Sequence, residues 1–347
     1  MKKLLLILTI ILLLAGGVFA LLLLGSAKGF EGNMKYLYIP TGEERKEKII
    51  ELLQKDSLVK HTGIFSLVAD RADYWEQIKP GKYKISAGDN ILDIVRMLKN
   101  GRQSPVNLTI TKIRTKENLA ALIGRKFECD SAAVMQFLLN QDTLSKFALD
   151  SNTIMTVVFP DTYTYFWNTT PSRIFAKLYD KYQYFWTAEK KALAQAHGLS
   201  PQTAYTLASI VEEETNKNDE KGNIASVYLN RMRTGMRLGA DPTVKYALRD
   251  FSLRRIYHKH LQVESPYNTY RVAGLPPGPI CSPSETTITA VLNAPQTDYI
   301  YFVANMDAPG SHTFTTNYED HLKYARTYQK ALDSIIKARQ QSNQLKQ

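Results

Sequence analysis

Cysteine is scarce in this chain, which contains only Cys129 and Cys281 among its 347 residues. The two lie far apart and form no CxxC pair, which excludes a disulfide-rich scaffold and a cysteine zinc site. The sequence leaves open whether they form one long-range disulfide or are two unrelated buried thiols. The remaining composition, 44% hydrophobic and 22% charged, is typical of a globular protein long enough for about two domains.

Several widespread functional motifs are also absent. The chain has no GxSxG elbow, P-loop, GxGxxG or HExxH motif, so we predict neither a cofactor nor a metal site. His258 and His260 lie in a basic segment, and we expect both to be solvated rather than to bind a metal. No zinc-finger or RNP-like motif accompanies the net charge of +11. We therefore favour an acidic polymer or a membrane surface over nucleic acid as the partner of this basic chain.

Charge is missing altogether from the apolar run Leu4–Leu24, which follows Lys2 and Lys3. As a helix this run spans about 31 Å, close to the ~30 Å hydrocarbon core of a bilayer. A cleaved signal peptide is the alternative, because Gly25-Ser26-Ala27 resembles a cleavage site, but the apolar region of a signal is usually shorter. We predict a retained single-pass anchor in the cytoplasmic (inner) membrane, with the body on the extracytoplasmic (periplasmic) side.

Three segments between residues 36 and 123 share a strand–turn–helix pattern. The second segment is the clearest, with a strand at Tyr83–Ile85 and a helical apolar face that runs from Ile91 to Leu98. A small βα module in an exported protein suggests a carbohydrate-binding unit of the LysM type. A purely structural scaffold would show the same pattern, and the sequence leaves that alternative open.

Residues 111–340 are predicted to form a second domain of mixed α+β structure. A helix that starts at Pro171 carries an aromatic stripe through Tyr182, which at helical spacing is more often core than a platform for sugars. Towards the C-terminus, strands at 299–303 and 312–314 flank a turn and precede a final amphipathic helix. The predicted class of the whole body is α+β.

The most informative segment is a predicted helix that begins at Ser200 and Pro201 and ends in three consecutive glutamates. Serine followed by proline is a typical pair for the N-cap and first helical position. Ala204, Leu207 and Val211 then define an apolar stripe. The glutamates therefore come where the stripe reaches the end of the helix, and their directions decide which of them is buried.

At about 100° per residue, the three glutamates point in different directions. Glu214 projects within about 20° of Leu207 on the apolar stripe, whereas Glu213 points to water and Glu212 lies on the border. A carboxyl at the end of an apolar stripe is costly to ionise, so its pKa is expected to rise, as a general acid for glycosidic cleavage requires. The alternative is that the stripe has ended and all three glutamates are solvated.

At this point the sequence resembles a known family, the endolytic murein (peptidoglycan) transglycosylases of the YceG-like family. The matching segments keep the order of the family over more than a hundred residues. They are Phe159–Thr162, Ala208–Thr215, Ala225–Arg231, Met236–Leu238, Asp241–Val244, Tyr267–Tyr270, Gly274–Ile280 and His312–Phe314. In this family the catalytic acid is the glutamate before the threonine of the Ile-Val-Glu-x-Glu-Thr motif, which is Glu214 here.

The resemblance implies a membrane anchor (4–24), a LysM-like module (34–110) and a catalytic domain (111–340). It implies cleavage of the MurNAc–GlcNAc β-1,4 bond of nascent glycan strands, which leaves 1,6-anhydro-MurNAc ends and limits strand elongation. The partners would be peptidoglycan glycan strands, the inner membrane and cell-wall synthases. The candidates for holding the glycan, its lactyl group or its peptide carboxylates are Asn230, Arg231, Asp241, Tyr267, Asn268 and His312. A structural role for Asn230 and Arg231 is an equal alternative, and a histidine in a strand, such as His312, is more often packed in the core.

Two other functions remain compatible with the sequence. A muramidase would hydrolyse the same bond with water and would normally need a second carboxylate, for which Asp241 is the one visible candidate. Asp241 precedes a proline, however, and its role could be to shape the loop. A non-catalytic, membrane-tethered peptidoglycan-binding scaffold is the alternative from a different class, and it would tolerate the loss of the Glu214 carboxyl.

Overall fold

The computed structural model describes residues 2–306 and 308–344, with side chains through residue 331. The chain forms two compact units, each of which contains helices and strands. The first comprises Met1–Leu108, Leu122–Ser131 and Tyr163–Pro171, and the second comprises Thr109–Ala121, Ala132–Thr162 and Ser172–Gln347. The predicted α+β class is confirmed.

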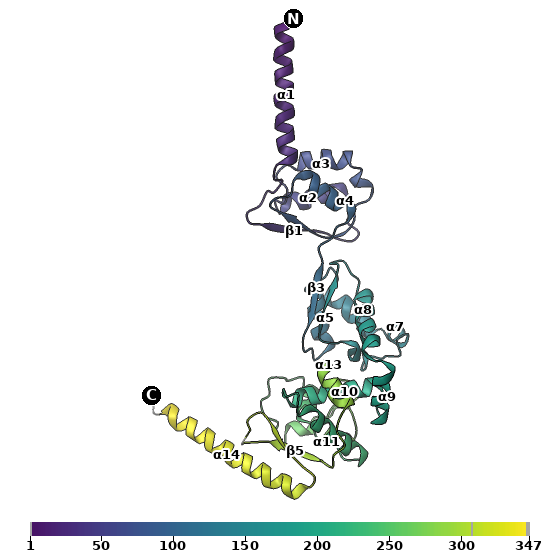
Figure 1. The fold of residues 1–347 in the computed structure, drawn as a ribbon, viewed down its shortest axis with the longest axis vertical. Coiled ribbons are helices and arrows are strands. Elements are labelled where there is room, and N and C mark those ends of the chain that lie inside the picture. Colours follow the sequence, from purple (N-terminus) through teal and green to yellow (C-terminus); the bar gives the residue numbers. More distant parts are fainter. Residues whose placement is uncertain (1, 307, 345–347) are drawn as a thin grey trace. The chain divides into compact units, whose positions relative to one another are not determined.

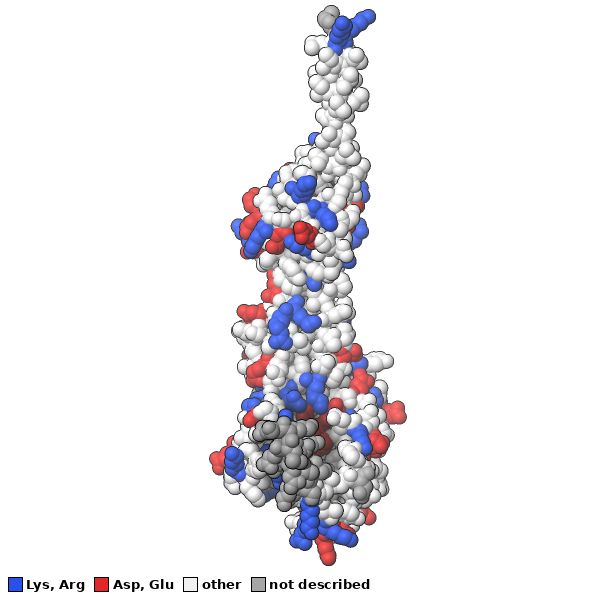
Figure 2. Space-filling model, turned by 90° about the vertical axis from the view of Figure 1, so that its left-hand side faces the viewer, with Lys and Arg blue, Asp and Glu red and all other residues white. Residues whose placement is uncertain are grey.

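The apolar run at the N-terminus forms a single helix, α1 (Lys2–Leu24), none of whose residues is buried. Figure 2 shows it as an uncharged column with basic side chains only at its N-terminal end. Within the described residues, α1 alone is long and apolar enough to cross a membrane. A signal sequence near an N-terminus can meet the same thresholds of length and hydropathy, so the helix by itself does not distinguish the two.

The first unit is built around the antiparallel strands β1 (Met34–Ile39) and β2 (Gly81–Ser86). Alternate residues of each strand are buried, as a sheet with one covered face requires. The covering helices are α2 (Lys46–Lys55), α3 (Thr62–Arg71) and α4 (Ile91–Asn100), together with a 3-10 turn at Tyr74–Glu76. Figure 1 shows these helices grouped on β1.

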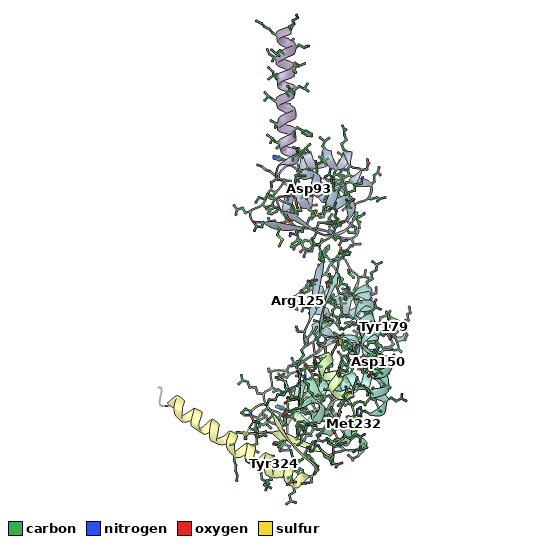
Figure 3. The ribbon with its side chains drawn as sticks, viewed as in Figure 1. Asp93, Arg125, Asp150, Tyr179, Met232 and Tyr324 are labelled. Carbon is green, nitrogen blue, oxygen red and sulfur yellow. The ribbon has the colours of Figure 1, made fainter. Side chains whose placement is uncertain are left out.

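Helix α4, whose apolar face was predicted, is capped at both ends. The side chain of Asn90 accepts a hydrogen bond from the backbone N–H of Asp93 at 2.9 Å, and Gly101 ends the helix with φ of 65°. Asp93 is labelled in Figure 3. Helix α3, by contrast, has no counterpart in the predicted pattern. The third predicted strand, β3 (Val106–Ile110), pairs with β4 (Asp161–Tyr165) rather than with β1 or β2.

The elements after β3 are mostly helical. They are α5 (Lys116–Gly124), α6 (Ser131–Leu139), α7 (Gln141–Ser145), α8 (Pro171–Phe185), α9 (Ala188–Ala196), α10 (Pro201–Glu214), α11 (Lys221–Arg233), α12 (Asp241–Leu248), α13 (Glu285–Leu292) and α14 (Tyr318–Gln344), with 3-10 turns at Ile154–Val157 and His260–Gln262. The only strands after β4 in the described part of the chain are β5 (Tyr301–Ala304) and β6 (His312–Thr315), which form an antiparallel hairpin.

Helix α10 is the centre of the second unit, where it packs against α9, α11, α12 and α13 (Figure 1). The aromatic stripe of α8 is buried, which confirms that it is core. The predicted C-terminal hairpin is also confirmed, and α14 begins beside it. Cys129 and Cys281 are both free thiols, so the alternative of two unrelated cysteines is confirmed, although only Cys281 is fully buried.

Candidate active site

The helix that carries the glutamates has the predicted N-terminal cap. The Ser200 side chain accepts a hydrogen bond from the backbone N–H of Thr203, whose hydroxyl in turn accepts one from the N–H of Ser200 at 2.7 Å. Every residue from Ala204 to Val211 is buried. Because the core encloses α10 on so many sides, the directions of the glutamates in its last turn are fixed by packing.

Glu214, the last residue of α10, receives a hydrogen bond from the neighbouring helix α11. The hydroxyl of Tyr228 donates to Oε1 of Glu214 at 2.6 Å. The ring of Tyr228 is buried and meets the ring of Phe302 edge-on, with centroids 5.9 Å apart. Because Tyr228 donates to Oε1, the proton of the neutral acid is carried by the other oxygen, Oε2.

Burial raises the pKa of Glu214 to about 7. The hydrogen bond from Tyr228 opposes this rise, the negative charge of Asp241 adds to it, and the positive charges of Lys245 and Arg231 oppose it. The direction agrees with the expectation from the apolar stripe. A carboxyl with a pKa near neutrality retains a proton for much of the time at pH 7, which is the property that a general acid needs.

Glu214 lines a cavity of about 530 Å³ in the second unit. The walls come from α11, the turn that precedes α12, the first residue of α12, Tyr270, strand β5 and the first turns of α14. Besides Glu214, the acidic and basic side chains on these walls are Arg231, Arg237, Asp241 and His321. The cavity therefore combines one proton donor with a second carboxylate, two permanent cations and an imidazole.

Asp241 supplies the second carboxylate of this cavity. It is the first residue of α12, so the segment expected as a loop is in fact a helix from this residue onwards. The hydroxyl of Tyr270 donates to Oδ1 of Asp241 at 2.6 Å. Asp241 is exposed, and its charge is one cause of the raised pKa of Glu214. The two carboxyl groups therefore interact electrostatically across one cavity.

Arg231 lies on the same face of α11 as Tyr228, three residues further along. Its Nε donates to the carbonyl of Ile300 at 2.7 Å, and its Nη1 donates to the carbonyl of Leu238. The guanidinium lies 5.4 Å from the centroid of the Tyr301 ring. Backbone acceptors thus fix two of its donor groups, and the remaining donors and the full positive charge are available to an anionic ligand in the cavity.

Four of the predicted glycan-binding residues do not line this cavity. Nδ2 of Asn230 donates to the carbonyls of Thr297 and Tyr299, and Nδ2 of Asn268 donates to those of Leu261 and Val263. These contacts hold backbone segments together. Asn230 also lines a separate cavity of about 400 Å³, whose walls contain no carboxylate.

Tyr267 and His312 also contact other parts of the protein. The ring of Tyr267 packs on that of Tyr246, with centroids 4.6 Å apart. Nδ1 of His312 lies 3.0 Å from Oε2 of Glu220, whose other oxygen accepts a hydrogen bond from the backbone N–H of His312. Among the predicted site residues, the structure therefore brings together Glu214, Arg231 and Asp241, and contact of the other four with a glycan stays a prediction.

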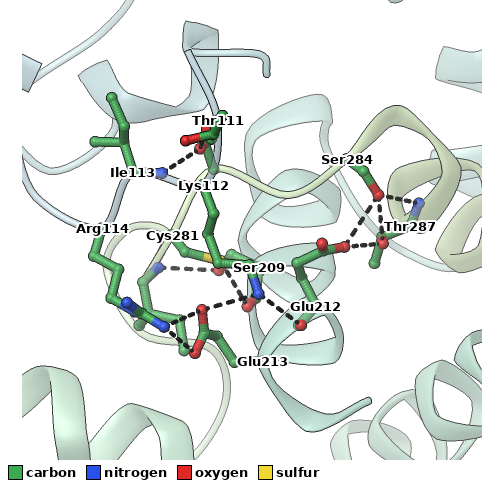
Figure 4. Close-up of polar contacts among 12 residues, drawn as sticks. Thr111, Lys112, Ile113, Arg114, Ser209, Glu212, Glu213, Cys281, Ser284 and Thr287 are labelled. Atoms are coloured by element: carbon green, nitrogen blue, oxygen red, sulfur yellow. Dashed lines mark hydrogen bonds and ion pairs between the residues drawn. The ribbon is translucent and has the colours of Figure 1, made fainter. Parts of the chain in front are cut away.

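Glu212 is held by a buried polar network on the opposite side of α10 (Figure 4). It accepts hydrogen bonds from the hydroxyls of Thr287 and Ser284 and pairs with Lys221 at 3.2 Å. Although burial alone would raise the pKa of Glu212, the hydrogen bond from Thr287 and the charge of Lys221 outweigh it and lower that pKa below its ordinary value. Glu212 is therefore an ionised structural residue.

Glu213 does not point freely into water, and this prediction was wrong. Its side chain is only 16% exposed, because Arg114 donates to both carboxylate oxygens at 2.9 and 3.1 Å and Lys112 approaches to 3.4 Å (Figure 4). The partners come from a segment about a hundred residues earlier, which helical periodicity cannot reveal. The three glutamates thus have three separate environments, and Glu214 alone faces the cavity.

Sequence reasoning missed eight residues of the cavity wall, among them Tyr228, Arg237, Tyr270 and His321. Tyr228 carried a usable signal, because it precedes Arg231 by one helical turn and must share its face. Tyr270 lies in a segment that was singled out, although Tyr267 and Asn268 were named instead. Arg237 lies in the matching segment Met236–Leu238 but was not named, and His321 lies outside every matching segment. Only the tertiary fold brings the 236–239 turn and α14 to Glu214.

The chain belongs to the YceG-like family, whose sequence model matches residues 37–327. Among characterised relatives, it is similar to a protein named endolytic murein transglycosylase from Bacillus subtilis (strain 168). The two are 28% identical over 305 residues, which is 84% of this chain and 83% of the relative. A protein of the same name from Streptococcus pneumoniae (strain D39) is also 28% identical, over 88% of this chain, but the match spans only 61% of that longer relative.

A solved structure shows the same relationship. The chain resembles the crystal structure of a yceG-like protein from Listeria monocytogenes, with 27% sequence identity and a TM-score of 0.55. The match covers 84% of this chain and 99% of the Listeria chain. The fold around Glu214 is therefore the fold of this family.

Proposed function

We propose that this protein is an endolytic peptidoglycan lytic transglycosylase and that Glu214 is its catalytic acid. The observation that carries the proposal is the environment of Glu214, a carboxyl with a pKa of about 7 that lines a cavity and accepts a hydrogen bond from Tyr228. Membership of the YceG-like family and the name shared by its relatives support the substrate class. The products would be two shorter glycan strands, because the bond that is cut lies inside the strand.

The reaction requires one group that gives up a proton and later takes one back. Glu214 protonates the bridging oxygen of the MurNAc–GlcNAc β-1,4 bond, and the bond between that oxygen and C1 of MurNAc breaks while positive charge develops on the MurNAc ring. The GlcNAc residue leaves with a free C4 hydroxyl. The resulting carboxylate then accepts the proton of the C6 hydroxyl of that ring, whose oxygen attacks C1 and closes the 1,6-anhydro bridge. The carboxyl is regenerated and no water is consumed, so a pKa near 7 suits both steps.

A water-dependent muramidase is the second candidate, and Asp241 is the observation that favours it. Asp241 lines the same cavity and interacts with Glu214 electrostatically, and glycosidases use a second carboxylate to activate water or form a covalent intermediate. The two mechanisms leave different chain ends. Anhydro-MurNAc ends require internal attack, whereas reducing MurNAc ends require water.

The cations of the cavity suit an acidic glycan. MurNAc carries a lactyl group and stem-peptide carboxylates, and Arg231 presents its charge to the cavity. Asn230, Tyr267, Asn268 and His312 remain candidates for contacts with longer strands outside this cavity. The net charge is +11, and on the face drawn in Figure 2 the basic side chains lie in several groups among acidic ones, which suits weak attraction along an extended acidic polymer.

We further propose that residues 4–24 anchor the protein in the cytoplasmic membrane, with the body on its extracytoplasmic side. The exposed apolar surface of α1 and the basic residues before it support this orientation. The βααβ order of β1, α2, α3 and β2 supports a LysM-like module within residues 34–110. Residues 111–340 would be the catalytic domain, and a position at the membrane would bring it close to cell-wall synthases.

The experiment compares the full-length protein in detergent with two variants, Glu214→Gln and Glu213→Gln. Each is incubated with uncrosslinked glycan strands, and the products are identified by mass spectrometry. Glu213→Gln is the matched control, because it removes a neighbouring carboxylate that faces Arg114 rather than the cavity. We expect anhydro-MurNAc ends from the wild type and the control, and a loss of about 100-fold or more in Glu214→Gln.

The other outcomes separate the alternatives. Reducing MurNAc ends would replace the lytic mechanism with hydrolysis and assign Asp241 the second catalytic role. If the wild type binds strands but leaves them intact, the protein would be a peptidoglycan-binding scaffold. Full activity of Glu214→Gln would remove Glu214 from the mechanism.

A further inference from the structure

Helix α14 places one side chain, His321, in the wall of the Glu214 cavity. The start of the helix is fixed, because the Asn317 side chain accepts a hydrogen bond from the backbone N–H of Asp320 at 2.9 Å. The backbone N–H of the next residue, His321, donates to the carbonyl oxygen of Asn317 at 3.4 Å. The position of His321 is therefore set by the helix cap and not by a flexible loop.

The plane of the imidazole is fixed as well. The ring stacks on that of Tyr301 in β5, with centroids 5.0 Å apart and an angle of 22° between the planes. It also lies at 29° to the ring of Tyr318 at 6.2 Å. An imidazole packed against two aromatic rings, which also contact each other at 5.7 Å, keeps the direction of its two nitrogens, and this is the condition for recognising a ligand atom at one place.

The two ring nitrogens of His321 differ in their surroundings. Nδ1 is enclosed and has no hydrogen-bond partner among the described residues. An enclosed lone pair costs less than an enclosed N–H, so the tautomer with its proton on Nε2 is favoured. Since the half-buried ring lines the cavity while Nδ1 is enclosed, Nε2 is the nitrogen left to face the cavity.

The charge state of the ring agrees with this assignment. Burial, and then the nearby charge of Arg231, lower the pKa of His321 below its ordinary value, so the ring is neutral at pH 7. A neutral imidazole donates one hydrogen bond without adding a third positive charge to a cavity that already holds Arg231 and Arg237. Such a donor suits an uncharged oxygen of a sugar better than a carboxylate.

We propose that His321 is a substrate-binding residue whose Nε2–H donates a hydrogen bond to an uncharged oxygen, a hydroxyl or an acetamide carbonyl, of the saccharide in the Glu214 cavity. This inference rests on the proposed function, because it takes an amino-sugar strand as the ligand. It gives α14 a role in completing the binding site that the Glu214 chemistry does not require. The aromatic stack with Tyr301 acts by orienting the donor.

The test uses full-length Glu214→Gln protein as the parent, so that glycan strands bind without being cut. His321→Ala, His321→Asn and His321→Gln are each added to this parent, and the Kd for uncrosslinked strands is measured by calorimetry. The amide of glutamine reaches about as far as Nε2, whereas that of asparagine reaches only as far as Nδ1. We expect Kd to rise about tenfold for alanine and asparagine, and to stay within about threefold of the parent for glutamine.

Tyr324→Ala is the matched control on the same helix (Figure 3), because that side chain is 43% exposed and does not line the cavity. It should bind strands like the parent. Equal weakening by glutamine and asparagine, or binding unchanged in all three variants, would overturn the proposal. The same changes in active protein should raise KM more than they lower kcat.

Cleavage by the wild type and strand binding by the His321 variants together separate this inference from the proposed function. If wild-type protein fails to cut strands but the parent binds them with the expected order among the His321 variants, the function is wrong and the role of His321 stands. If wild-type protein cuts strands and the His321→Ala variant has an unchanged KM, the role of His321 is wrong and the function stands.

Discussion

The hydroxyl of Tyr228 donates to Oε1 of Glu214 at 2.6 Å, and this hydrogen bond works against the effect of burial on the same carboxyl. Burial favours the protonated acid, whereas the phenol favours the carboxylate. The result is a pKa of about 7, between the ordinary value for glutamate and the value that burial alone would give. Three predictions about pH follow from this balance.

The first prediction concerns the pH dependence of cleavage. Because Glu214 must hold a proton to act as the acid, kcat/KM for glycan strands should be constant at acidic pH and fall as pH rises through about 7. Initial rates measured with subsaturating strands between about pH 3.5 and 9 give this profile. A decline centred near the ordinary glutamate pKa of 4.5 would contradict the raised pKa of Glu214.

The second prediction concerns Tyr228→Phe, which keeps the ring and its edge-on contact with Phe302 but removes the donor. Because the lost hydrogen bond had favoured the ionised form, the pKa of Glu214 should rise. The alkaline decline in kcat/KM should move to higher pH, while the rate at the acidic plateau falls about tenfold at most. A shift to lower pH would show that Tyr228 favours the protonated acid instead.

The third prediction concerns stability. Glu214 has a higher pKa in the folded state than its ordinary value of 4.5, so the folded protein binds more protons between pH 4.5 and about 7. The stability that this group contributes is fully present below pH 4.5 and is lost as pH rises through about 7. At pH 8, Glu214→Gln should therefore be more stable than the wild type, by roughly 3 kcal/mol at most.

Denaturant unfolding of the two proteins at pH 4.5 and pH 8 checks this difference. At pH 4.5 the two should have nearly equal stability, because the wild-type carboxyl is then protonated and resembles the glutamine amide. If the free energy of unfolding of the wild type rose relative to that of the variant as pH increased, the result would contradict a raised pKa for Glu214.

The fourth prediction concerns Asp241→Asn. Under the single-acid mechanism, this variant still makes anhydro-MurNAc ends, and mass spectrometry of the products should show them. The negative charge of Asp241 raises the pKa of Glu214, so its removal should move the alkaline decline in kcat/KM to lower pH. Loss of turnover as complete as in Glu214→Gln would instead make Asp241 a base or nucleophile. Tyr270→Phe, which removes only the hydrogen bond to Asp241, is the milder comparison.

The fifth prediction concerns the buried pair of Glu212 and Lys221. Lys221 is buried and donates to both Glu212 and Thr287. Lys221→Met should lower the free energy of unfolding by about 3 kcal/mol, because it leaves a carboxylate without its counter-charge inside the protein. The double variant Glu212→Gln/Lys221→Met should lose less than the sum of the two single changes.

Denaturant unfolding at pH 7 measures these losses, and Lys191→Met on the exposed surface of α9 is the control, with an expected change within about 0.5 kcal/mol. Additive single and double changes would show that Glu212 and Lys221 do not act as a pair.

Local patterns in the sequence predicted much of the fold. The cap at Ser200 and the apolar stripe of α10 gave the direction of Glu214, because helix geometry alone relates it to Leu207. The C-terminal hairpin was predicted from its alternation and turn. Such features depend on residues close in sequence, and the structure confirms both the cap and the hairpin.

The features that could not be predicted depend on distant partners. Glu213 is covered by Arg114 and Lys112, β3 pairs with β4 across about fifty residues, and His321 reaches the cavity only because α14 begins beside β5. Periodicity specifies which face of a helix is apolar. It does not specify which charged groups from distant segments form ion pairs with the polar side chains beside that face. The environment of Glu214 could be anticipated, whereas the identity of its neighbours could not.

Each of the three consecutive glutamates at the end of α10 has its own surroundings, so the direction of each must be kept. The number of residues in the helix is therefore constrained. Deleting one residue between Pro201 and Val211 would rotate the last turn by about 100° relative to the core. The cavity would lose its acid, and Lys221 and Arg114 would lose their carboxylates in the same event. Point changes in this helix can be graded from mild to severe, but an insertion or deletion of a single codon disables chemistry and packing together.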